Sequence, residues 1–223
     1  MPEHDILCVL FDLDGTLADT APDLAGALNR TRLEDGLPAL PLSQLRPLTS
    51  QGVRGLLRAG YGISPDDARY AALADRVLQH YSANICVDTQ LFAGMPALLA
   101  ELEARGLPWG IVTNKHTRFT TPLVAAMQLN QRAACVVSGD TTAKAKPAPE
   151  PLLHAAALCA IAPERCIYLG DDERDIIAAK AAGMHSVAVR WGYIGEDKPI
   201  EAWNADYTIE QPLDLLDYLS AKA

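Results

Sequence analysis

Short apolar runs that alternate with helical segments constrain the fold of this chain more than any other feature of its sequence. The first run covers residues 6–10, and later runs cover 109–113, 134–137, 166–169, 186–189 and 206–209. Residues with helical periodicity separate most of these runs. Such alternation is typical of a parallel sheet that helices cover on both faces. We therefore expect an α/β fold with a mainly parallel sheet.

The segment 19–87 interrupts this alternation, because it contains helical patterns and little strand signal. Thr20 and Pro22 predict the start of one helix, and Ser64-Pro65 predicts the start of another. A helical block between the first strand and the rest is typical of an inserted domain. We expect a core that comprises residues 1–18 and 88–223, with a helical insertion over 19–87.

Polar side chains follow several predicted strands at the point where each strand ends. Asp12 and Asp14 follow the first run, and Thr113 and Asn114 follow the second. Ligands of parallel sheets bind outside the carboxyl ends of the strands. We therefore expect one site at this edge, to which further residues also contribute: Lys146, Asp171, Asp172 and Asp175.

Asp12 and Asp14 lie two residues apart, so both carboxylates project to the same side if the backbone is extended. Like charges at this distance repel each other, and at least one must be neutralised by a proton, a cation or a cationic side chain. An ordinary turn at Asp14-Gly15 is the alternative interpretation.

Composition excludes some classes of partner. The formal net charge is −9 and no basic run is present, which argues against nucleic acid and against an anionic membrane surface. A small anionic substrate remains compatible, because local charge at a site can oppose the net charge.

The five cysteines have neither zinc-site spacing nor a C-x-x-C pair, so we expect no disulfides. The polar N-terminus and the short first apolar run predict a cytoplasmic protein. The sequence leaves open whether it is a monomer or a homodimer.

Four motifs in this order resemble the haloacid dehalogenase-like phosphatase superfamily. They are Asp-x-Asp-Gly-Thr from Asp12, the strand-end Thr113, Lys-Pro-x-Pro from Lys146, and Gly-Asp-Asp-x-x-Asp from Gly170. The resemblance covers nearly the whole chain. With the helical insertion after the first motif, it is similar to the phosphoglycolate phosphatase and β-phosphoglucomutase branch. It implies a Rossmann-like core with a helical cap that sets substrate specificity.

The resemblance implies phosphomonoester hydrolysis through an aspartyl-phosphate. Asp12 matches the nucleophile, which would split one difficult step into two. Asp14 matches the general acid that protonates the leaving alcohol and then activates water as a base. Lys146 would bring positive charge to Asp12 and to the phosphate, although Lys144 is a rival two positions away.

The same resemblance implies the groups that bind phosphate. Thr113, Asn114 and the backbone around Gly15 would donate hydrogen bonds to the phosphoryl oxygens. An ordinary strand-end hydroxyl is the alternative for Thr113 taken by itself. His116, which follows closely, is more typical of a solvated histidine.

A hard divalent cation would offset the negative charge of the predicted site, and oxygen-only ligands are those that Mg²⁺ prefers. The resemblance implies that Asp12 and Asp171 supply carboxylates and that Asp14 supplies its backbone carbonyl. Asp175 would support these ligands from outside. Asp172 stands where many relatives carry serine, and an acid favoured by the helix dipole is its simplest interpretation.

The substrate is predicted less sharply than the chemistry. Arg54, in the segment 49–55, suits an anionic or hydroxylated leaving group, but a solvated helix start explains that segment nearly as well. The segments 90–96, 109–115 and 191–194 look like those of N-acetylmuramic acid 6-phosphate phosphatases. A small phosphorylated metabolite is therefore expected, with phosphoglycolate first and the amino-sugar phosphate second.

Three other activities remain as alternatives. A phosphomutase would keep both Asp12 and Asp14, so only its products separate it from a phosphatase. A phospho-accepting receiver module also uses acids, a Thr, a Lys and Mg²⁺, but the motif order and the helical insertion argue against it. A dehalogenase is disfavoured, because its chemistry does not need the acid at Asp14.

Overall fold

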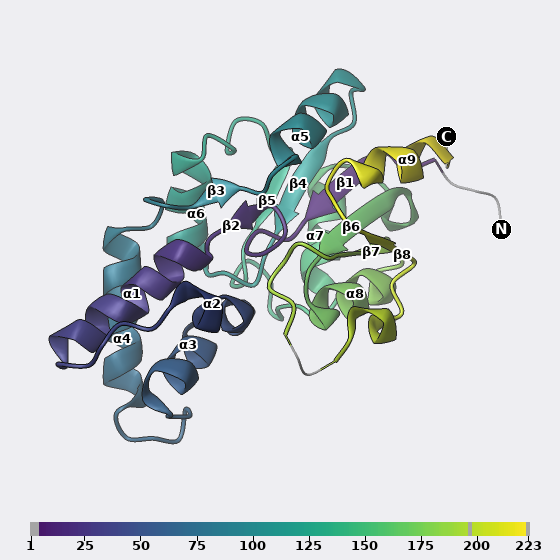
Figure 1. Ribbon diagram of the computed structural model, residues 1–223. Helices are drawn as coiled ribbons and strands as arrows, with labels where there is room; N and C mark the ends of the chain where they lie inside the picture. Colours follow the sequence, from purple (N-terminus) through teal and green to yellow (C-terminus); the bar gives the residue numbers. More distant parts are fainter. Residues whose placement is uncertain (1–4, 196–197, 222–223) are drawn as a thin grey trace. The chain divides into compact units, whose positions relative to one another are not determined.

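The computed structural model of the protein describes residues 5–195 and 198–221. The chain divides into two compact units (Figure 1). One comprises Met1–Ala18 and Leu91–Ala223, and the other comprises Asp19–Gln90.

The first unit contains a six-stranded sheet with the strand order β5-β4-β1-β6-β7-β8. Its strands are β1 (Cys8–Phe11), β4 (Trp109–Val112), β5 (Cys135–Val137), β6 (Cys166–Gly170), β7 (His185–Val189) and β8 (Tyr207–Ile209). The strand pairs described in it are parallel, and Phe11 lies in register with Ile111 of β4 and Leu169 of β6. The predicted α/β fold with a mainly parallel sheet is confirmed.

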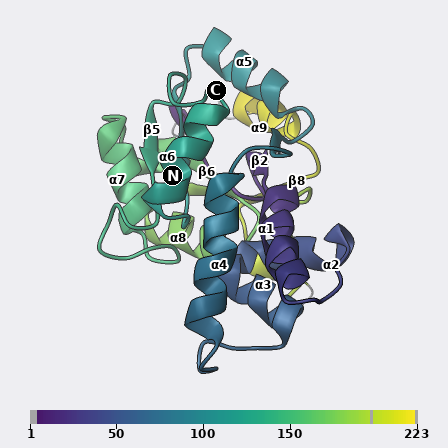
Figure 2. The same cartoon turned by 90° about the vertical axis from the view of Figure 1, so that its left-hand side faces the viewer.

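Helices cover both faces of this sheet. They are α5 (Met95–Ala104), α6 (Thr117–Ala126), α7 (Glu150–Leu158), α8 (Glu173–Ala181) and α9 (Asp214–Ala221), with 3₁₀ helices at Pro163–Arg165 and Ile200–Trp203. Small apolar side chains of α7 and α8 pack on β1, β5 and β6 in one core cluster. Two views place α5 and α9 together, away from α7 and α8 (Figures 1 and 2).

The order of the strands locates the crevice of the sheet. From β1 the chain proceeds outward to β4 and β5, then returns to β6 on the other side of β1 and proceeds to β7 and β8. Where the strand order reverses, the loops at the carboxyl ends diverge and leave a crevice for a ligand. The segments after β1 and β6 meet at this point.

The second unit is helical. It comprises α1 (Ala21–Glu34), α2 (Leu42–Leu45), a 3₁₀ helix (Arg46–Gln51), α3 (Gly52–Tyr61) and α4 (Tyr70–Ala83). The predicted helix start at Ser64-Pro65 is wrong, because residues 64–69 form turns. The Asp67 carboxylate there accepts hydrogen bonds from the backbone and guanidinium of Arg69, and α4 begins only at Tyr70.

The two chain crossings between the units lie in paired segments. Strands β2 (Ala18–Asp19) and β3 (Gln90–Leu91) form a two-stranded sheet, and the division between the units falls within both strands. Close by, the buried Asp23 carboxylate accepts backbone N–H bonds from Val87, Asp88 and Thr89, each at 3.0 Å. This carboxylate therefore joins the start of α1 to the segment that leads into β3.

Replacing Asp23 with Asn is expected to destabilise the second unit. An amide keeps one acceptor oxygen but turns its NH₂ toward the remaining donors, and hydrogen bonds to a charged group each contribute roughly 1.5–3 kcal/mol. Urea unfolding is expected to show a loss of about 2–4 kcal/mol. Asp75→Asn, on the exposed side of α4, is the matched control. A loss in Asp23→Asn no larger than in this control would contradict the inference.

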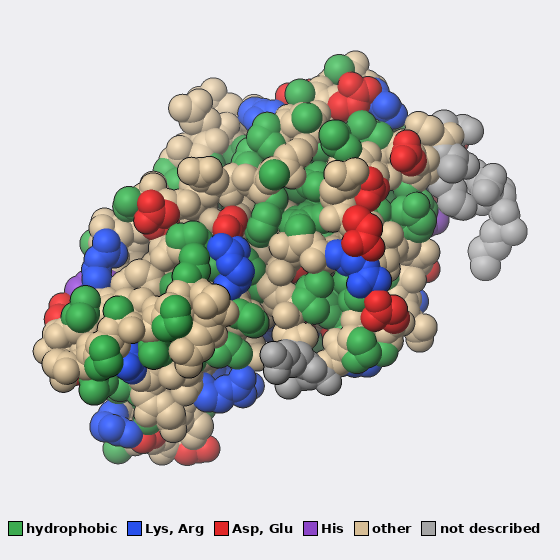
Figure 3. Space-filling view, viewed as in Figure 1, with side chains coloured by type: hydrophobic (Ala, Val, Ile, Leu, Met, Phe, Trp, Pro, Cys, Tyr) green, Lys and Arg blue, Asp and Glu red, His purple; other side chains and the backbone are tan. Residues whose placement is uncertain are grey.

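No helix within the described residues combines the length and apolar character needed to cross a membrane. On the face drawn in Figure 3, Lys and Arg side chains are interspersed with Asp and Glu rather than gathered into one basic surface.

Candidate active site

Asp12 and Asp14 follow β1, and each carboxylate contacts its own lysine. Asp12 Oδ1 lies 3.0 Å from Lys146 Nζ, and Asp14 Oδ1 lies 2.8 Å from Lys115 Nζ. The expected repulsion between the two acids is thus offset by two ammonium groups from different loops. Lys115 follows β4, and Lys146 precedes α7.

Lys146 is more deeply buried than Lys115, and its side chain is 2 % exposed. Besides Asp12, its ammonium contacts Asp175 Oδ1 at 2.8 Å, the Tyr168 hydroxyl at 2.6 Å and the Val112 carbonyl at 3.1 Å. Burial acts to lower the pKa of Lys146, but Asp12 and Asp175 outweigh it and the net pKa is raised. The lysine therefore stays charged.

The rival Lys144 has a different environment. Its side chain is 71 % exposed and contacts Glu150 at 3.2 Å. Lys146 is therefore the lysine of this loop that the structure brings to Asp12.

Three carboxylates gather around Asp12. Oxygen atoms of Asp12, Asp171 and Asp175 all lie within 4.8 Å of one another. Burial raises the pKa of Asp12 to about 7, with Asp175 and Asp14 adding to the shift against the opposing charge of Lys146. Burial also raises the pKa of Asp171 well above its usual range, and Asp12 and Asp175 add to that shift.

The donors around Asp171 fix its orientation. Thr16 Oγ1 donates to Asp171 Oδ1 at 2.8 Å, and the Tyr193 N–H donates to Oδ2 at 2.8 Å. The Trp191 indole donates to the Thr16 carbonyl at 2.9 Å, so the loop after β7 holds the first motif as well.

Two glycines are required by the close approach of Asp171. Gly15 has φ +87°, and a Cβ there would lie 2.1 Å from Asp171 Oδ2. A Cβ at Gly192 would lie 2.2 Å from Asp171 Cβ. Neither position accepts a side chain, so the loops after β1 and β7 both close on this carboxylate.

The donor set fits a hard divalent cation. Carboxylates from the end of β1, the end of β6 and the first turn of α8 converge, and a cation would offset the repulsion between their like charges. Carboxylate oxygens with no nitrogen or sulfur donor in the group are the ligands that Mg²⁺ or Ca²⁺ prefers. The Asp12 and Asp171 carboxylates could hold it directly, because Asp175, the third of the group, already contacts Lys146 Nζ at 2.8 Å.

Thr113 and Asn114 lie directly after β4, as expected. Thr113 is buried, and its hydroxyl accepts the Lys115 N–H at 3.1 Å. The Asn114 amide donates to the Lys146 carbonyl and accepts the Lys146 N–H, both at 2.9 Å. Asn114 therefore holds the backbone of the loop that carries Lys146.

Other candidates lie in different surroundings. Asp172 caps α8 and accepts the Arg174 N–H, in a capping box with Asp175. The His116 side chain is 65 % exposed and lies 3.5 Å from Asp140. Arg54 is exposed on α3 of the second unit, so its segment does form a helix start.

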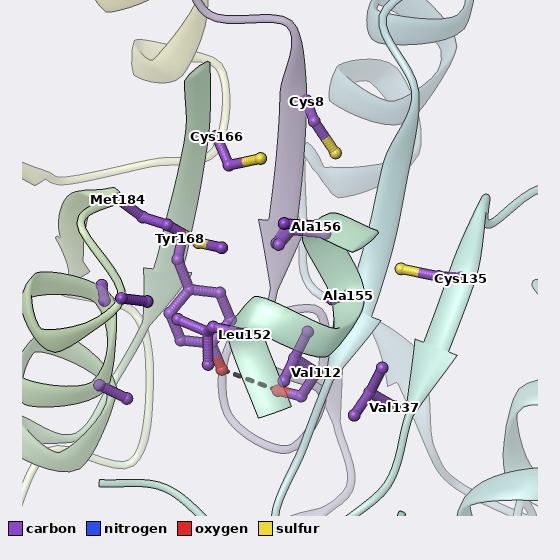
Figure 4. Close-up of a cluster of buried hydrophobic side chains, with 14 residues drawn as sticks. Cys8, Val112, Cys135, Val137, Leu152, Ala155, Ala156, Cys166, Tyr168 and Met184 are labelled. Carbon is purple, nitrogen blue, oxygen red and sulfur yellow. Dashed lines mark hydrogen bonds between the residues drawn. The ribbon is translucent and has the colours of Figure 1, made fainter. Parts of the chain in front are cut away.

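Sequence reasoning missed several residues of this site. Tyr168 lies within β6 and was not distinguishable from core, although its hydroxyl also donates to the Val112 carbonyl at 2.7 Å (Figure 4). Thr16 belongs to the first motif and Lys115 follows Thr113-Asn114, so their motifs were the available signal. Tyr193 acts through its backbone, for which the sequence carried no signal.

Residues 9–189 match the family model described as haloacid dehalogenase-like hydrolase. The chain belongs to this family. The predicted resemblance is confirmed.

Similar proteins include two kinds of named phosphatase. A phosphoglycolate phosphatase of Xanthomonas campestris is 46% identical over 93% of this chain and 93% of the relative. An N-acetylmuramic acid 6-phosphate phosphatase of Pseudomonas aeruginosa is 40% identical over 98% of this chain and 97% of the relative. A crystal structure of a predicted phosphoglycolate phosphatase from Haemophilus somnus has a TM-score of 0.82 at 24% identity, covering 98% and 99% of the two chains. That structure supports the fold alone.

Proposed function

We propose that the protein is a Mg²⁺-dependent phosphomonoester hydrolase that forms an aspartyl-phosphate on Asp12. The observation that carries the proposal is the buried Lys146 ammonium 3.0 Å from Asp12, at the centre of three converging carboxylates. A buried nucleophile with fixed positive charge beside it suits the transfer of an anionic phosphoryl group. The phosphatase names of relatives at 46% and 40% identity support the same reaction.

In the first step, an Asp12 oxygen forms a bond to phosphorus while the bond from phosphorus to the ester oxygen breaks. Asp14 gives its proton to the departing oxygen, so an alcohol leaves. Lys146 keeps its charge beside Asp12 and offsets the negative charge of the phosphoryl oxygens. The Thr113 hydroxyl donates a hydrogen bond to the same oxygens. The Gly15 N–H, expected to do the same, instead donates to the Ala18 carbonyl at 3.0 Å.

In the second step, water attacks phosphorus and gives a proton to Asp14. The bond between Asp12 and phosphorus breaks, phosphate leaves, and the Asp12 carboxylate is restored. Asp14 ends the cycle protonated, as it began. The sum of both steps is ester plus water to alcohol plus phosphate.

A bound Mg²⁺ would supply positive charge that lowers the repulsion between the phosphoryl oxygens and the carboxylates. Asp12 and Asp171 would hold it with their carboxylates and Asp14 with its backbone carbonyl, and Asp175 would support them. Asp175 also contacts the Lys146 ammonium, so it would connect that lysine to the carboxylates that hold the cation.

Cation binding is expected to stabilise the protein more at pH 8 than at pH 5.5. Without cation, the pKa of Asp12 is raised to about 7, so protonation of this carboxyl stabilises the folded state. That contribution is complete below the unfolded pKa of about 4 and is lost as the pH rises through about 7. Mg²⁺ competes with these protons, so its binding strengthens as they leave.

Thermal unfolding in chelator and in excess Mg²⁺ measures this effect. We expect a Tm increase of a few degrees at pH 8, roughly the effect of 1–2 kcal/mol for a chain of this size, and a smaller increase at pH 5.5. Asp171→Asn is expected to reduce the Mg²⁺-dependent shift. An equal shift at both pH values would contradict the assigned carboxylates.

The substrate is a small phosphorylated metabolite, with phosphoglycolate proposed first and N-acetylmuramic acid 6-phosphate second. Phosphate release from a panel of both compounds and of hexose phosphates, in the presence of Mg²⁺, tests the function. We expect continuous release, with the highest kcat/KM for one of the first two. Failure to release phosphate from any ester would overturn the proposed function.

The same panel separates the other activities. Conversion of a hexose phosphate into its isomer without net phosphate release would identify a phosphomutase. Uptake of one phosphoryl group per chain, without continuous release, would identify a receiver. We propose that the helical unit 19–90 selects the substrate, with Arg54 as a candidate contact.

A further inference from the structure

We propose that Lys115 is a positioning residue for the acid–base carboxylate of Asp14. The inference rests on the proposed function, because it assigns Asp14 the proton transfers of that reaction. It goes beyond the four motifs, none of which gives Lys115 a role.

The contact between the two side chains is short and enclosed. Lys115 Nζ lies 2.8 Å from Asp14 Oδ1, with side chains that are 8 % and 17 % exposed. A lysine with so little exposure has lost most of its rotamer freedom, so it holds the carboxylate in a single direction.

The backbone of Lys115 is fixed at both ends. Its N–H donates to Thr113 Oγ1 at 3.1 Å, and its carbonyl accepts the Thr120 hydroxyl at 3.0 Å and the Gly139 N–H at 2.9 Å. Gly139 approaches so closely that a Cβ there would lie 2.2 Å from the Asn114 carbonyl oxygen. The loop after β4 therefore presents the ammonium from a rigid base.

The two lysines of the site have different surroundings and, we infer, different tasks. Lys146 contacts Asp12 and Asp175 and lies with the nucleophile. Lys115 contacts Asp14. Loss of Lys115 should therefore impair leaving-group protonation more than attack on phosphorus.

Leaving groups of different basicity separate these effects. An aliphatic alkoxide needs a proton to leave, whereas 4-nitrophenolate leaves without one. Because kcat/KM reports the steps through the first phosphoryl transfer, Lys115→Met is expected to lower it by about 10- to 100-fold for phosphoglycolate. The loss for 4-nitrophenyl phosphate should stay within about 3-fold.

A double-mutant cycle with Asp14→Asn completes the test. Lys115→Met is expected to change the residual activity of Asp14→Asn by less than about 2-fold, since its effect acts through that carboxylate. Lys144→Met is the control, because it makes the same substitution at an exposed lysine. Equal losses on both esters, or an additive loss in the double variant, would overturn the inference. If wild type hydrolyses both esters and Lys115→Met matches it, only this inference fails; if wild type hydrolyses neither, the proposed function fails.

Three thiols lie at the amino ends of the strands, at the opposite end of the sheet from the candidate active site. Cys8, Cys135 and Cys166 are the first residues of β1, β5 and β6, so they lie at the amino ends of the strands (Figure 4). Cys159 directly follows α7, and its Sγ lies 3.6 Å from Cys135 Sγ. The missing side chain of Gly110 makes room for the Cys135 sulfur, because a Cβ at Gly110 would lie 2.5 Å from Cys135 Sγ.

We infer that Cys135 and Cys159 form an oxidisable dithiol that a hydroperoxide converts into a disulfide. The Cys159 thiol loses its proton and the thiolate attacks a peroxide oxygen. The O–O bond breaks and the leaving oxygen takes up a proton, so a sulfenic acid and water form. The Cys135 sulfur then displaces the second oxygen as water. Two thiols and one peroxide thus give one disulfide and two waters when the oxidant is hydrogen peroxide.

Cys159 has the features of the attacking thiol. It is partly exposed, and its hydrogen-bonding contacts with Cys135 and then with Cys8 lower its pKa. Cys86 is also partly exposed, but burial and the nearby Asp23 raise its pKa. Cys86 is therefore the matched control thiol.

Treatment with hydrogen peroxide, alkylation with maleimide and peptide mass mapping test this pair. We expect two fewer alkylated thiols and a linked peptide pair that contains Cys135 and Cys159. Before oxidation, Cys159 should be alkylated roughly 10-fold faster than Cys86. Cys159→Ser should prevent the link, whereas Cys86→Ser should leave it. Oxidation that stops at a sulfinic acid, or a link between other cysteines, would overturn the inference, and wild-type mapping alone decides this if a variant fails to fold.

Discussion

Asp12→Asn is expected to lower kcat by at least roughly 10⁴-fold, because the amide cannot act as the nucleophile. The substitution keeps the shape of the side chain and removes one of three clustered carboxylates. The pKa of Asp12 is raised chiefly by burial, so a neutral group at this position costs the fold little at neutral pH. Phosphate release under saturating substrate and Mg²⁺ measures the loss, and circular dichroism measures the fold.

Asp172→Asn is the matched control, since it changes the neighbouring acid of another motif. Asn is as good an N-cap as Asp, so α8 should keep its first turn. We expect activity within about 3-fold of wild type, because the Asp172 carboxylate is bonded to Arg174. Near-normal turnover in Asp12→Asn would contradict the assignment of the nucleophile.

Lys146→Met is expected to impair both activity and stability. Removing the ammonium leaves Asp12 and Asp175 without their shared counter-charge, and breaking a buried ion pair in this way costs about 3–5 kcal/mol. The cost should be larger at pH 8 than at pH 5.5, because protonation of the raised-pKa Asp12 relieves it at low pH. Loss of a fixed charge beside the phosphoryl group should lower kcat by roughly 10²–10³-fold.

Lys144→Met serves as the control for this variant, because it removes the same charge from an exposed position in the same loop. We expect it to keep wild-type stability within about 0.5 kcal/mol and normal turnover. Urea unfolding at both pH values and phosphate release are the measurements. Equal effects of the two substitutions would show that the buried position of Lys146 has no special role.

The sheet was predictable because its strands carry their own signal. The runs before Asp12, Thr113 and Asp171 are continuous and apolar, as buried parallel strands require, and the polar residues stand directly after them. The edge where they meet follows from the rule for parallel sheets.

The pairing of charges was not predictable from the sequence. Lys115 lies 101 residues from Asp14, and the register of the loops decides which lysine meets which acid. Tyr168 has the pattern of an ordinary strand residue, and its contact with Lys146 joins residues that lie 22 positions apart in the chain. The start of α4 was missed because Asp67 bonds to Arg69 locally, in competition with the helix.

The most direct test of the proposed mechanism is the detection of a phosphoryl group on Asp12. In Asp14→Asn, 4-nitrophenolate can still leave, but water lacks the base that activates it, so the aspartyl-phosphate should accumulate. Acid quenching after mixing with 4-nitrophenyl phosphate and Mg²⁺, followed by peptide mass analysis, is the measurement. We expect one equivalent of nitrophenolate and a phosphoryl group on the peptide that contains Asp12. An unmodified Asp12 peptide during continued turnover, or a phosphoryl group on another residue, would contradict it.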